Sequence, residues 1–346
     1  MKTIVLTGGG TAGHVIPHFA LLLELFKHFD KIYYIGSIGG LEEKLVKEKG
    51  LPFYPIPCVK LVRNNLTKNI TLPFKFVKSI SEAKKILKEL KPSVVFSKGG
   101  YVGLPVTIAA SKLNIPVIVH ESDLTLGLSN KIASKFAKKV LTSFEDTAKQ
   151  IKNGVFVGSP IRKELFEIEK QTALSHFDFK ADKPVLLITG GSLGAKAINE
   201  TVLQALPTLL KDFYVIHVVG KGNLTNYTNA NYRQIEFADM KYCYSACDYA
   251  ISRAGANTAF ELIALKKPTL FIPLPKGNSR GDQVDNANYF AHKNLAKVLL
   301  QENLTQTNLI TAVNKLVKDK NCLIENMNKC KIVNATEKTI EILKNY

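Results

Sequence analysis

The sequence predicts an α/β protein with two tandem Rossmann-like domains, each built on a doubly wound parallel sheet. A short apolar strand, a Gly-rich loop and a helix follow one another from Thr3, and the same succession begins again at Val185. The strands are continuous apolar runs, which is typical of parallel strands covered by helices on both faces. With 346 residues the chain is also long for a single core, so two domains are expected.

Short apolar runs followed by helical patterns predict the strands of the first domain. We expect them at Thr3–Thr7, Ile32–Ile35, Phe53–Ile56, Ser93–Ser97, Val117–Val119 and Val140–Thr142. A helix is predicted over Val15–Phe26. This domain is expected to span residues 1–160, because the segment Val155–Arg162 closes the alternating pattern.

The second domain is expected to span residues 161–330. Its strands are predicted at Val185–Thr189, Tyr214–Val219, Tyr249–Ile251 and Thr269–Pro273. A helix is predicted over Val284–His292, and a terminal helical stretch over Leu304–Leu343. We expect residues 331–346 to form a helix that packs back on the N-terminal domain.

Composition narrows the class of protein and its location. Five cysteines without a CxxC motif favour reduced thiols over a disulfide framework or a zinc site. The chain begins with a strand and has no apolar run of membrane-spanning length, so we expect no signal peptide, no transmembrane helix and a cytoplasmic location. The net charge of +18 favours an anionic partner. Without RNA-binding aromatic motifs or a zinc motif, we expect no nucleic-acid partner.

Residues 60–80, here called the basic–apolar segment, interleave apolar side chains with lysines and one arginine. Lys68, Lys75 and Lys78 are among the basic residues. Apolar burial and charge attraction add at the surface of an anionic bilayer, so the segment is a candidate for membrane docking. The alternative is a helix that faces the core and presents a solvated basic side.

The stretch Ser252–Glu261 carries the strongest single signal for a ligand. Its small residues leave a predicted strand and open a helix. The first N–H groups of a helix lack internal partners and carry partial positive charge, which makes this end a site for a phosphate group. Glu261 follows within two turns, within reach of sugar hydroxyls at the same opening. An ordinary strand-to-helix turn with a solvated glutamate is the alternative.

The first Gly-rich loop, Gly8–His14, matches the GxGxxG pattern of dinucleotide-binding domains. Such domains need an acidic residue at the end of the second strand, and here that strand ends in Gly36-Ser37. A dehydrogenase is therefore disfavoured. What remains is a loop whose backbone N–H groups a ligand can approach, with a histidine at its end.

Seven motifs occur in order along the chain, and together they are specific. They are Thr7-Gly-Gly-Gly-Thr-Ala-Gly-His14, Lys98-Gly-Gly-Tyr-Val-Gly103, His120-Glu121, Gly158-Ser-Pro-Ile-Arg162, Gly190-Gly-Ser-Leu-Gly-Ala195, Arg253-Ala-Gly-Ala256 with Glu261, and Asp282-Gln283 with Asn286-Ala287. Over essentially its whole length the chain resembles the MurG family of bacterial cell-wall N-acetylglucosaminyltransferases. The resemblance implies the GT-B fold, with a cleft between the two domains.

The resemblance also implies a reaction and its partners. N-acetylglucosamine (GlcNAc) would move from UDP-GlcNAc to the C4 hydroxyl of MurNAc in lipid I, the undecaprenyl-diphosphate-linked MurNAc-pentapeptide, giving lipid II and UDP in peptidoglycan synthesis. The enzyme would work as a peripheral protein at the cytoplasmic leaflet, among anionic lipids and other cell-wall and division proteins. Another UDP-sugar enzyme with the GT-B fold, such as a diacylglycerol glucosyltransferase or a UDP-GlcNAc epimerase, is the alternative.

Family roles can be carried over to the matching residues of this sequence. The resemblance implies that Arg162 and Ser192 contact the diphosphate and that the backbone of Phe237 meets the uracil. It implies that Glu261 binds the ribose and that Gln283, beside Asp282, holds the GlcNAc hydroxyls. The remaining residues implied to bind UDP-GlcNAc are Thr11, Ala12, Gly13, Asp123, Ala256, Asn257, Thr258, Ala259 and Phe260. At Asp123 many members of the family have Asn.

Attack by a hydroxyl on an anomeric carbon needs a base for the hydroxyl proton and stabilisation of the leaving diphosphate. His14 is the candidate base, since an imidazole with a pKa near ~6.5 exchanges protons near neutral pH. It could instead only satisfy a loop carbonyl, and Glu121 is then the rival base or the partner that orients His14. With no DxD motif or cluster of carboxylates, we expect no metal and no cofactor. The family implies inversion at the anomeric carbon.

Overall fold

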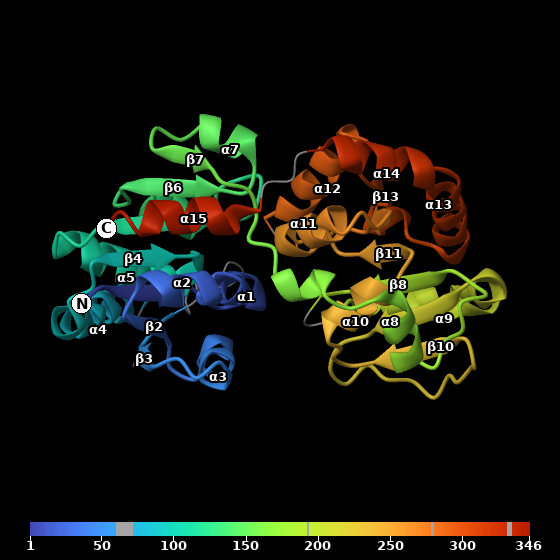
Figure 1. The fold of residues 1–346 in the computed structure, drawn as a ribbon, viewed down its shortest axis with the longest axis horizontal. Coiled ribbons are helices and arrows are strands. Elements are labelled where there is room, and N and C mark those ends of the chain that lie inside the picture. Colours follow the sequence, from blue (N-terminus) through green and yellow to red (C-terminus); the bar gives the residue numbers. More distant parts are fainter. Residues whose placement is uncertain (60–71, 192–193, 278–279, 331–333) are drawn as a thin grey trace. The chain divides into compact units, whose positions relative to one another are not determined.

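The structure, a computed structural model, describes residues 1–59, 72–191, 194–277, 280–330 and 334–346. The chain divides into two compact units. Unit 1 comprises residues 1–161 and 333–346, and unit 2 comprises residues 162–332. Each unit is a parallel sheet with helices on both faces (Figure 1). The predicted fold class of two Rossmann-like parallel-sheet domains is therefore confirmed.

Unit 1 is built on a parallel sheet with the strand order β3-β2-β1-β4-β5-β6-β7. The strands are β1 (Thr3–Thr7), β2 (Lys31–Ser37), β3 (Phe53–Ile56), β4 (Val94–Ser97), β5 (Val117–Glu121), β6 (Lys139–Thr142) and β7 (Gly154–Phe156). Their order reverses direction between β1 and β4. Ligands of such open sheets bind outside the carboxyl ends of the strands at this switch point.

The helices of unit 1 cover both faces of this sheet. They are the short 3₁₀ helix η1 (Ala12–His14), α1 (Ile16–Phe19), α2 (Leu22–His28), α3 (Leu41–Glu48), α4 (Leu72–Leu90), α5 (Gly100–Lys112), α6 (Leu128–Ala133), α7 (Glu145–Lys149) and α15 (Ala335–Leu343). The prediction of one continuous helix over Val15–Phe26 is wrong. Pro17 lies in the first turn of α1 and has no N–H to continue a helix from η1, so the segment splits into shorter pieces.

The core of unit 1 lies in two layers because side chains of a strand alternate between faces. On β1, Ile4 and Leu6 belong to one buried cluster and Val5 to the other. The first cluster is completed by α15, whose Ile340 and Leu343 pack into it. The second lies under α4 and α5. Residues far apart in the sequence thus close the same face of the sheet.

Unit 2 repeats the architecture with the strand order β10-β9-β8-β11-β12-β13. The strands are β8 (Val185–Thr189), β9 (Tyr214–Val218), β10 (Tyr232–Ile235), β11 (Tyr249–Ser252), β12 (Thr269–Phe271) and β13 (Lys297–Val298). Sequence periodicity missed β10, β13 and, in unit 1, β7. All three are short strands at sheet edges, where polar residues are tolerated and the apolar signal is weak.

The helices of unit 2 are η3 (Lys163–Phe166), α8 (Lys170–His176), α9 (Lys196–Asp212), α10 (Met240–Ala246), α11 (Ala256–Ala264), α12 (Asp282–His292), η4 (Gln301–Asn303), α13 (Gln306–Lys318) and α14 (Lys320–Lys329). The predicted terminal helical stretch is three separate helices. α13 and α14 belong to unit 2, and α15 belongs to unit 1. A parallel bridge from Ser159 to Asn334 precedes α15.

We predict that Leu343→Ala lowers the stability of unit 1. Leu343 is fully buried against the cluster formed by β1, and deleting a buried leucine side chain costs about 2–5 kcal/mol. Thermal unfolding should show a lower midpoint for this variant. The exposed neighbour Glu341, changed to Ala, is the matched control and should leave the midpoint almost unchanged. Equal midpoints for Leu343→Ala and the native chain would contradict this packing role.

Candidate active site

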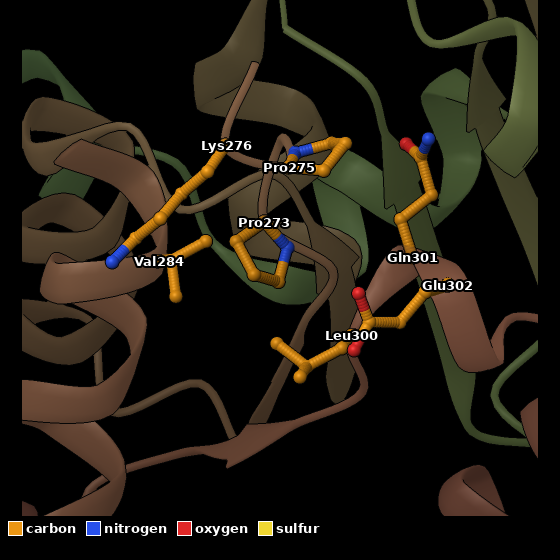
Figure 2. A pocket seen from close by; sticks show the side chains of 7 residues that line it. All are labelled: Pro273, Pro275, Lys276, Val284, Leu300, Gln301 and Glu302. Carbon is orange, nitrogen blue, oxygen red and sulfur yellow. The ribbon is translucent and has the colours of Figure 1, made fainter. Parts of the chain in front are cut away.

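A small pocket of about 190 Å³ opens in unit 2 beside the end of β12 and the start of α12 (Figure 2). It is lined by Pro273, Pro275, Lys276, Val284, Leu300, Gln301 and Glu302. None of the residues predicted to bind UDP-GlcNAc lines it, although Val284 follows Gln283 directly. The pocket is therefore distinct from the polar residues that the sequence singled out.

The stretch Ser252–Glu261 folds as predicted from a strand into a helix. β11 ends at Ser252 and α11 begins at Ala256, with Gly255 as its N-cap residue. A glycine supplies no side chain to cap the helix, so the first turn of α11 presents backbone N–H groups at the carboxyl edge of the sheet. This edge carries the partial positive charge of the helix dipole.

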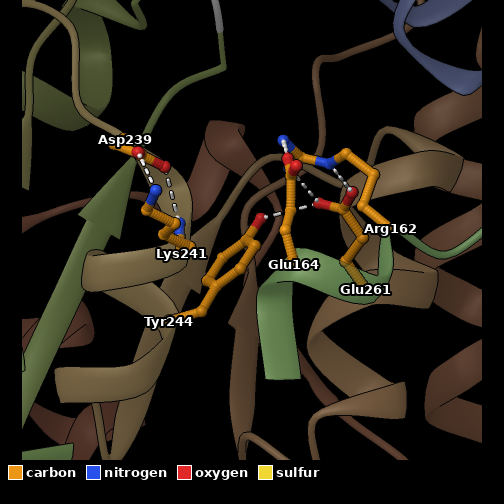
Figure 3. Close-up of polar contacts among 6 residues, drawn as sticks. All are labelled: Arg162, Glu164, Asp239, Lys241, Tyr244 and Glu261. Carbon is orange, nitrogen blue, oxygen red and sulfur yellow. Dashed lines mark hydrogen bonds and ion pairs between the residues drawn. The ribbon is translucent and has the colours of Figure 1, made fainter. Parts of the chain in front are cut away.

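Arg162 and Glu261 form an ion pair in unit 2 (Figure 3). Arg162 directly precedes η3, and Glu261 lies on α11. The Arg162 Nε donates to Glu261 Oε1 at 3.0 Å, and Nη2 donates to Oε2 at 3.4 Å. Glu164 accepts from Arg162 Nη1 at 3.3 Å. The Tyr244 hydroxyl, from α10, donates to Glu261 Oε2 at 3.2 Å. Two residues predicted to bind different parts of UDP are thus brought together.

The network keeps Arg162 charged and Tyr244 protonated. Burial lowers the pKa of the Arg162 guanidinium, but the charge and hydrogen bonds of Glu261 outweigh burial and raise it above its ordinary value. Arg162 therefore stays cationic at every physiological pH. Burial, followed by the charge of Glu261, raises the pKa of the Tyr244 phenol well above its usual range, so Tyr244 remains a hydrogen-bond donor. A cationic fork beside a carboxylate suits a diphosphate and a sugar diol.

The predicted ligands Ala256–Phe260 all lie on the first turns of α11. Ala259 and Phe260 are buried, and the Phe260 ring meets Phe290 edge to face at 5.2 Å. Their side chains therefore belong to the core. Contacts of these two residues with a ligand would have to come from the backbone, whereas Asn257 and Thr258 are only half-buried.

Arg253, in the same loop, holds the loop in place through its hydrogen bonds. Its guanidinium donates to the carbonyl oxygens of Ile272 and Pro273 and to Gln301 Oε1. These bonds tie the loop before α11 to the end of β12 and to η4. The Asn286 side chain donates to the Ala254 carbonyl and holds the same loop from α12.

The other residues predicted to meet the donor are more scattered. Gln283 lies on α12, and its Oε1 accepts from the Leu274 N–H at 3.0 Å. Asp282 pairs with Arg280 at 3.4 Å. Phe237, between β10 and α10, is 61% exposed. Ser192 lies outside the described residues.

In unit 1 the Gly-rich loop leads from β1 into η1, which holds Ala12, Gly13 and His14. Thr11 Oγ1 lies 3.0 Å from His14 Nδ1, so the threonine fixes the imidazole ring. The loop is close to a second Gly-rich loop at the end of β4. A side chain at Gly100 would collide with the Gly9 carbonyl oxygen, and its Cβ would lie 3.3 Å from His14 Nδ1.

Glu42, a residue that sequence reasoning missed, supports the Gly-rich loop from α3. Its buried carboxylate accepts from the Gly10 N–H at 3.2 Å and from the N–H and hydroxyl of Ser37. One N–H of the loop is therefore already paired within the protein. The expectation that this loop offers its N–H groups to a ligand must be restricted to the other residues.

Glu121 and its hydrogen bonds shape the loop that follows β5. Its carboxylate accepts from the N–H groups of Asp123 and Gly127 and from Asn130 Nδ2, each at 3.0 Å. It is nearly fully buried. These three hydrogen bonds tie the carboxylate to the backbone of the loop and to α6. The geometry assigns Glu121 to holding the loop 122–127.

Lys98 opens the second Gly-rich motif, but sequence reasoning assigned it no role. It is 1% exposed, and its Nζ lies 2.6 Å from His120 Nδ1 and 2.8 Å from Ser122 Oγ. Burial lowers the pKa of Lys98 to about 7, against the charges of Glu121 and Asp123, which raise it. Burial and then the Lys98 charge lower the pKa of His120 well below its usual range, so His120 is neutral and accepts from the amine.

The residues that the sequence motifs missed carried weak signals. Tyr244 sits in a short amphipathic helix with no motif around it, and Glu42 is one of two adjacent glutamates at the start of α3. The signal at Lys98 was stronger, because it directly follows an apolar strand that is expected to be buried, and lysines are rarely buried. Among the described residues, no group of three or more His, Cys, Asp or Glu side chains could hold a metal ion.

Both halves of the chain match known protein families. Residues 4–142 match the glycosyltransferase family 28 N-terminal domain, and residues 185–343 match the glycosyltransferase family 28 C-terminal domain. The two matches lie in the expected order and cover most of the chain.

Curated relatives match the chain over its full length. A UDP-N-acetylglucosamine--N-acetylmuramyl-(pentapeptide) pyrophosphoryl-undecaprenol N-acetylglucosamine transferase from Clostridium botulinum (strain Kyoto / Type A2) is 47% identical over 352 residues, which cover 100% of this chain and 99% of that protein. A protein of the same name from Lachnospira eligens is 44% identical, with 99% of each covered.

Solved structures match the fold as well. The crystal structure of Acinetobacter baumannii MurG has a TM-score of 0.77 at 28% identity, with 100% of both chains covered. The UDP-GlcNAc 2-epimerase of Neisseria meningitidis has a TM-score of 0.72 at 17% identity, with 100% of both chains covered, and shows likeness of fold alone.

We predict that Lys98→Met removes a pH dependence of stability. The pKa of Lys98 is about 7 in the folded protein and ~10.4 in an unfolded chain. Between these values the unfolded state binds a proton that the folded state does not, so native stability rises with pH. Thermal midpoints at pH 7.5 and 9 should rise less for Lys98→Met than for the native chain. The exposed Lys112→Met variant is the control, and an unchanged pH slope in Lys98→Met would contradict the assignment.

Proposed function

Since the chain belongs to glycosyltransferase family 28 and within it to the MurG family of N-acetylglucosamine transferases, we propose that it transfers GlcNAc from UDP-GlcNAc to lipid I. It is a glycosyltransferase of peptidoglycan synthesis. The acceptor hydroxyl is C4–OH of MurNAc, and the products are lipid II and UDP.

One observation carries this proposal. The chain is 47% identical to a transferase of that name over the full length of both proteins, so donor and acceptor halves match together. The alternatives, a diacylglycerol glucosyltransferase or a UDP-GlcNAc epimerase, have less support. The epimerase shares the fold at only 17% identity.

Unit 2 supplies the donor side of the reaction. Arg162, held by Glu261 and Glu164, is a cation that would stabilise charge on the departing diphosphate. The N-terminus of α11 adds partial positive charge for the same phosphates. Glu261, oriented by Tyr244, would accept hydrogen bonds from the ribose hydroxyls. Arg162 and Glu261 stay close enough to bind adjacent parts of one UDP.

Unit 1 supplies the base. Thr11 holds the His14 ring through Nδ1, and we assign proton transfer to Nε2. As the acceptor C4 oxygen bonds to the anomeric carbon, its proton passes to His14. The bond from the anomeric carbon to the phosphate oxygen breaks, and UDP leaves with the electron pair. Attack from the face opposite UDP inverts the configuration.

In this scheme Glu121 has a structural role and takes no part in proton transfer. Its carboxylate already accepts hydrogen bonds from the N–H groups of Asp123 and Gly127 and from Asn130 Nδ2. Glu121 therefore shapes the loop that carries Asp123, the residue assigned to the transferred sugar. His14 is the better candidate for the base.

The N-terminal half of α4 supports a docking role at an anionic membrane. Phe74 is 80% exposed and Val77 is 65% exposed, and the exposed Lys75 and Lys78 flank them. Exposed apolar side chains ringed by lysines suit the headgroup region of a bilayer. Residues 60–71 of the basic–apolar segment, Lys68 among them, lie outside the described residues. In the described parts of the chain, no helix is long and apolar enough to cross a membrane.

This location fits the acceptor. The undecaprenyl chain of lipid I holds its sugar at the cytoplasmic leaflet, so an enzyme that docks there meets the acceptor at high local concentration. A peripheral enzyme at this point of wall synthesis would influence cell shape and division, and would work beside other cell-wall and division proteins.

The reaction is tested with labelled UDP-GlcNAc and lipid I in detergent. The native chain should transfer label to the lipid fraction with EDTA present, and His14→Ala should lose at least about 100-fold in kcat, the range expected for a missing general base. Binding of UDP by His14→Ala, measured by calorimetry, should stay near that of the native chain.

Other outcomes would redirect the proposal. Full activity in His14→Ala, together with loss in Glu121→Gln, would move the base to Glu121. Binding of UDP-GlcNAc by the native chain without transfer to lipid I would refute the proposed acceptor. An α-linked product by NMR would refute inversion.

Membrane docking is tested by flotation with vesicles of phosphatidylglycerol and phosphatidylcholine. Charge reversal in Lys75→Glu/Lys78→Glu should weaken binding more than about tenfold at low salt, since each lysine near an anionic surface contributes about 1 kcal/mol. Lys112→Glu, at the other end of unit 1's helical layer on α5, is the control. Equal binding by the double variant and the native chain would remove α4 from the docking surface.

A further inference from the structure

The Arg162–Glu261 ion pair occupies the carboxylate that is assigned to the ribose (Figure 3). Arg162 Nε donates to Oε1 at 3.0 Å and Nη2 donates to Oε2 at 3.4 Å, so the guanidinium binds both oxygens as a fork. The Tyr244 hydroxyl also donates to Oε2, at 3.2 Å. An ionised carboxylate offers about four acceptor directions, and these contacts use all but one of them.

A ribose needs more than the single direction that these contacts leave. Its two neighbouring hydroxyls donate to one carboxylate together only where two acceptor directions are open to the ligand. The side chain of Glu261 is only 10% exposed, and that of Arg162 only 20%. In the paired state, Glu261 therefore lacks the acceptor directions to bind both hydroxyls of a ribose.

A diphosphate offers the guanidinium a replacement partner. Glu261 lies about 7.5 Å along the axis of α11 from Ala256, at the end of the helix where phosphates bind. Phosphate oxygens accept the same forked hydrogen bonds as a carboxylate. Breaking a buried ion pair without a substitute is costly, whereas exchanging a carboxylate for a phosphate keeps the guanidinium paired.

We propose that the diphosphate of the donor makes Arg162 and Glu261 exchange partners. In the ligand-free enzyme, the Arg162 fork occupies Glu261. When a nucleoside diphosphate binds, Arg162 moves to the phosphates, Tyr244 keeps its bond to Glu261, and the freed acceptor directions receive both ribose hydroxyls. Recognition of phosphate and recognition of ribose are thereby coupled. The inference rests on the proposed function, which assigns the diphosphate to Arg162 and the ribose to Glu261.

The partner exchange predicts effects of opposite sign for two ligands. Arg162→Met removes the fork and frees Glu261, so uridine, which has no phosphate, should bind at least about threefold more tightly, the gain of roughly one net hydrogen bond. UDP loses a charged hydrogen-bond donor and should bind at least about tenfold more weakly. A phosphate ligand that did not restrict Glu261 would lower UDP affinity and leave uridine unchanged.

Binding titrations by NMR at pH 8, where carboxylates are ionised, compare the native chain, Arg162→Met and the control Lys163→Met. The ligands are UDP, uridine and 2′,3′-dideoxyuridine. Lys163→Met removes the same charge from the adjacent, exposed residue and should leave uridine binding within about twofold of native. The dideoxy nucleoside lacks both ribose hydroxyls, so its affinity should not rise in Arg162→Met. Thermal unfolding checks that each variant is folded.

A second measurement uses the native chain alone. The chain has five arginines, so labelling with ¹⁵N-arginine gives few side-chain Nε–H signals. The Arg162 signal, assigned by through-bond correlation to its backbone, should move when UDP is added, because its acceptor changes from a carboxylate to a phosphate. Uridine should leave it in place. If Arg162 instead stays on Glu261 and contacts the phosphates with its remaining N–H groups, Nε keeps its carboxylate partner.

Uridine affinity that stays the same or falls in Arg162→Met, or an Arg162 Nε–H signal that UDP leaves in place, would overturn the partner exchange. If Arg162→Met does not fold, the Nε–H signal decides alone. A native chain that binds no UDP would refute the proposed donor and this inference together. Binding of UDP-GlcNAc without transfer to lipid I would refute the proposed acceptor alone, because neither measurement uses lipid I.

Discussion

Parallel strand pairing is the constraint on which the rest of the structure depends. Every pairing in both sheets is parallel, so each strand must be followed by a crossover that returns the chain to the same edge. The carboxyl ends of all strands therefore meet at one edge of each sheet. The Gly-rich loops, His14, the Lys98 amine and the N-terminus of α11 all lie in segments that follow strands, and for this reason each unit gathers its chemistry in one place.

The two units use this edge differently. In unit 2, opposite charges pair with each other: Arg162 and Glu261 form a mostly buried ion pair, and the Tyr244 hydroxyl donates to the carboxylate. In unit 1, charge is mostly buried and used to hold loops, as with Glu42 under Gly10 and Glu121 under the loop 122–127. Both arrangements follow from the same topology.

The sequence predicted the central strands of both sheets, because continuous apolar runs and Gly-rich loops are local signals. It did not predict β7, β10 and β13, whose short edge positions carry little apolar pattern, nor the division of residues 12–28 into η1, α1 and α2. The sequence motifs identified His14, Arg162 and Glu261 as candidate site residues. Sequence reasoning missed Tyr244 and Glu42, and it placed Lys98 in a motif without a role. The roles of these residues come from contacts between segments distant in sequence, such as Tyr244 with Glu261, and no local pattern records such contacts.

The return of the chain to unit 1 has a consequence for biosynthesis. α15 covers the face of the sheet that carries Ile4 and Leu6, yet it begins only at Ala335, long after β7 ends at Phe156. While the ribosome makes unit 2, the first sheet has all its strands but keeps part of one apolar face bare. The nascent N-terminal half therefore exposes apolar surface throughout that interval, although its own sequence was translated first.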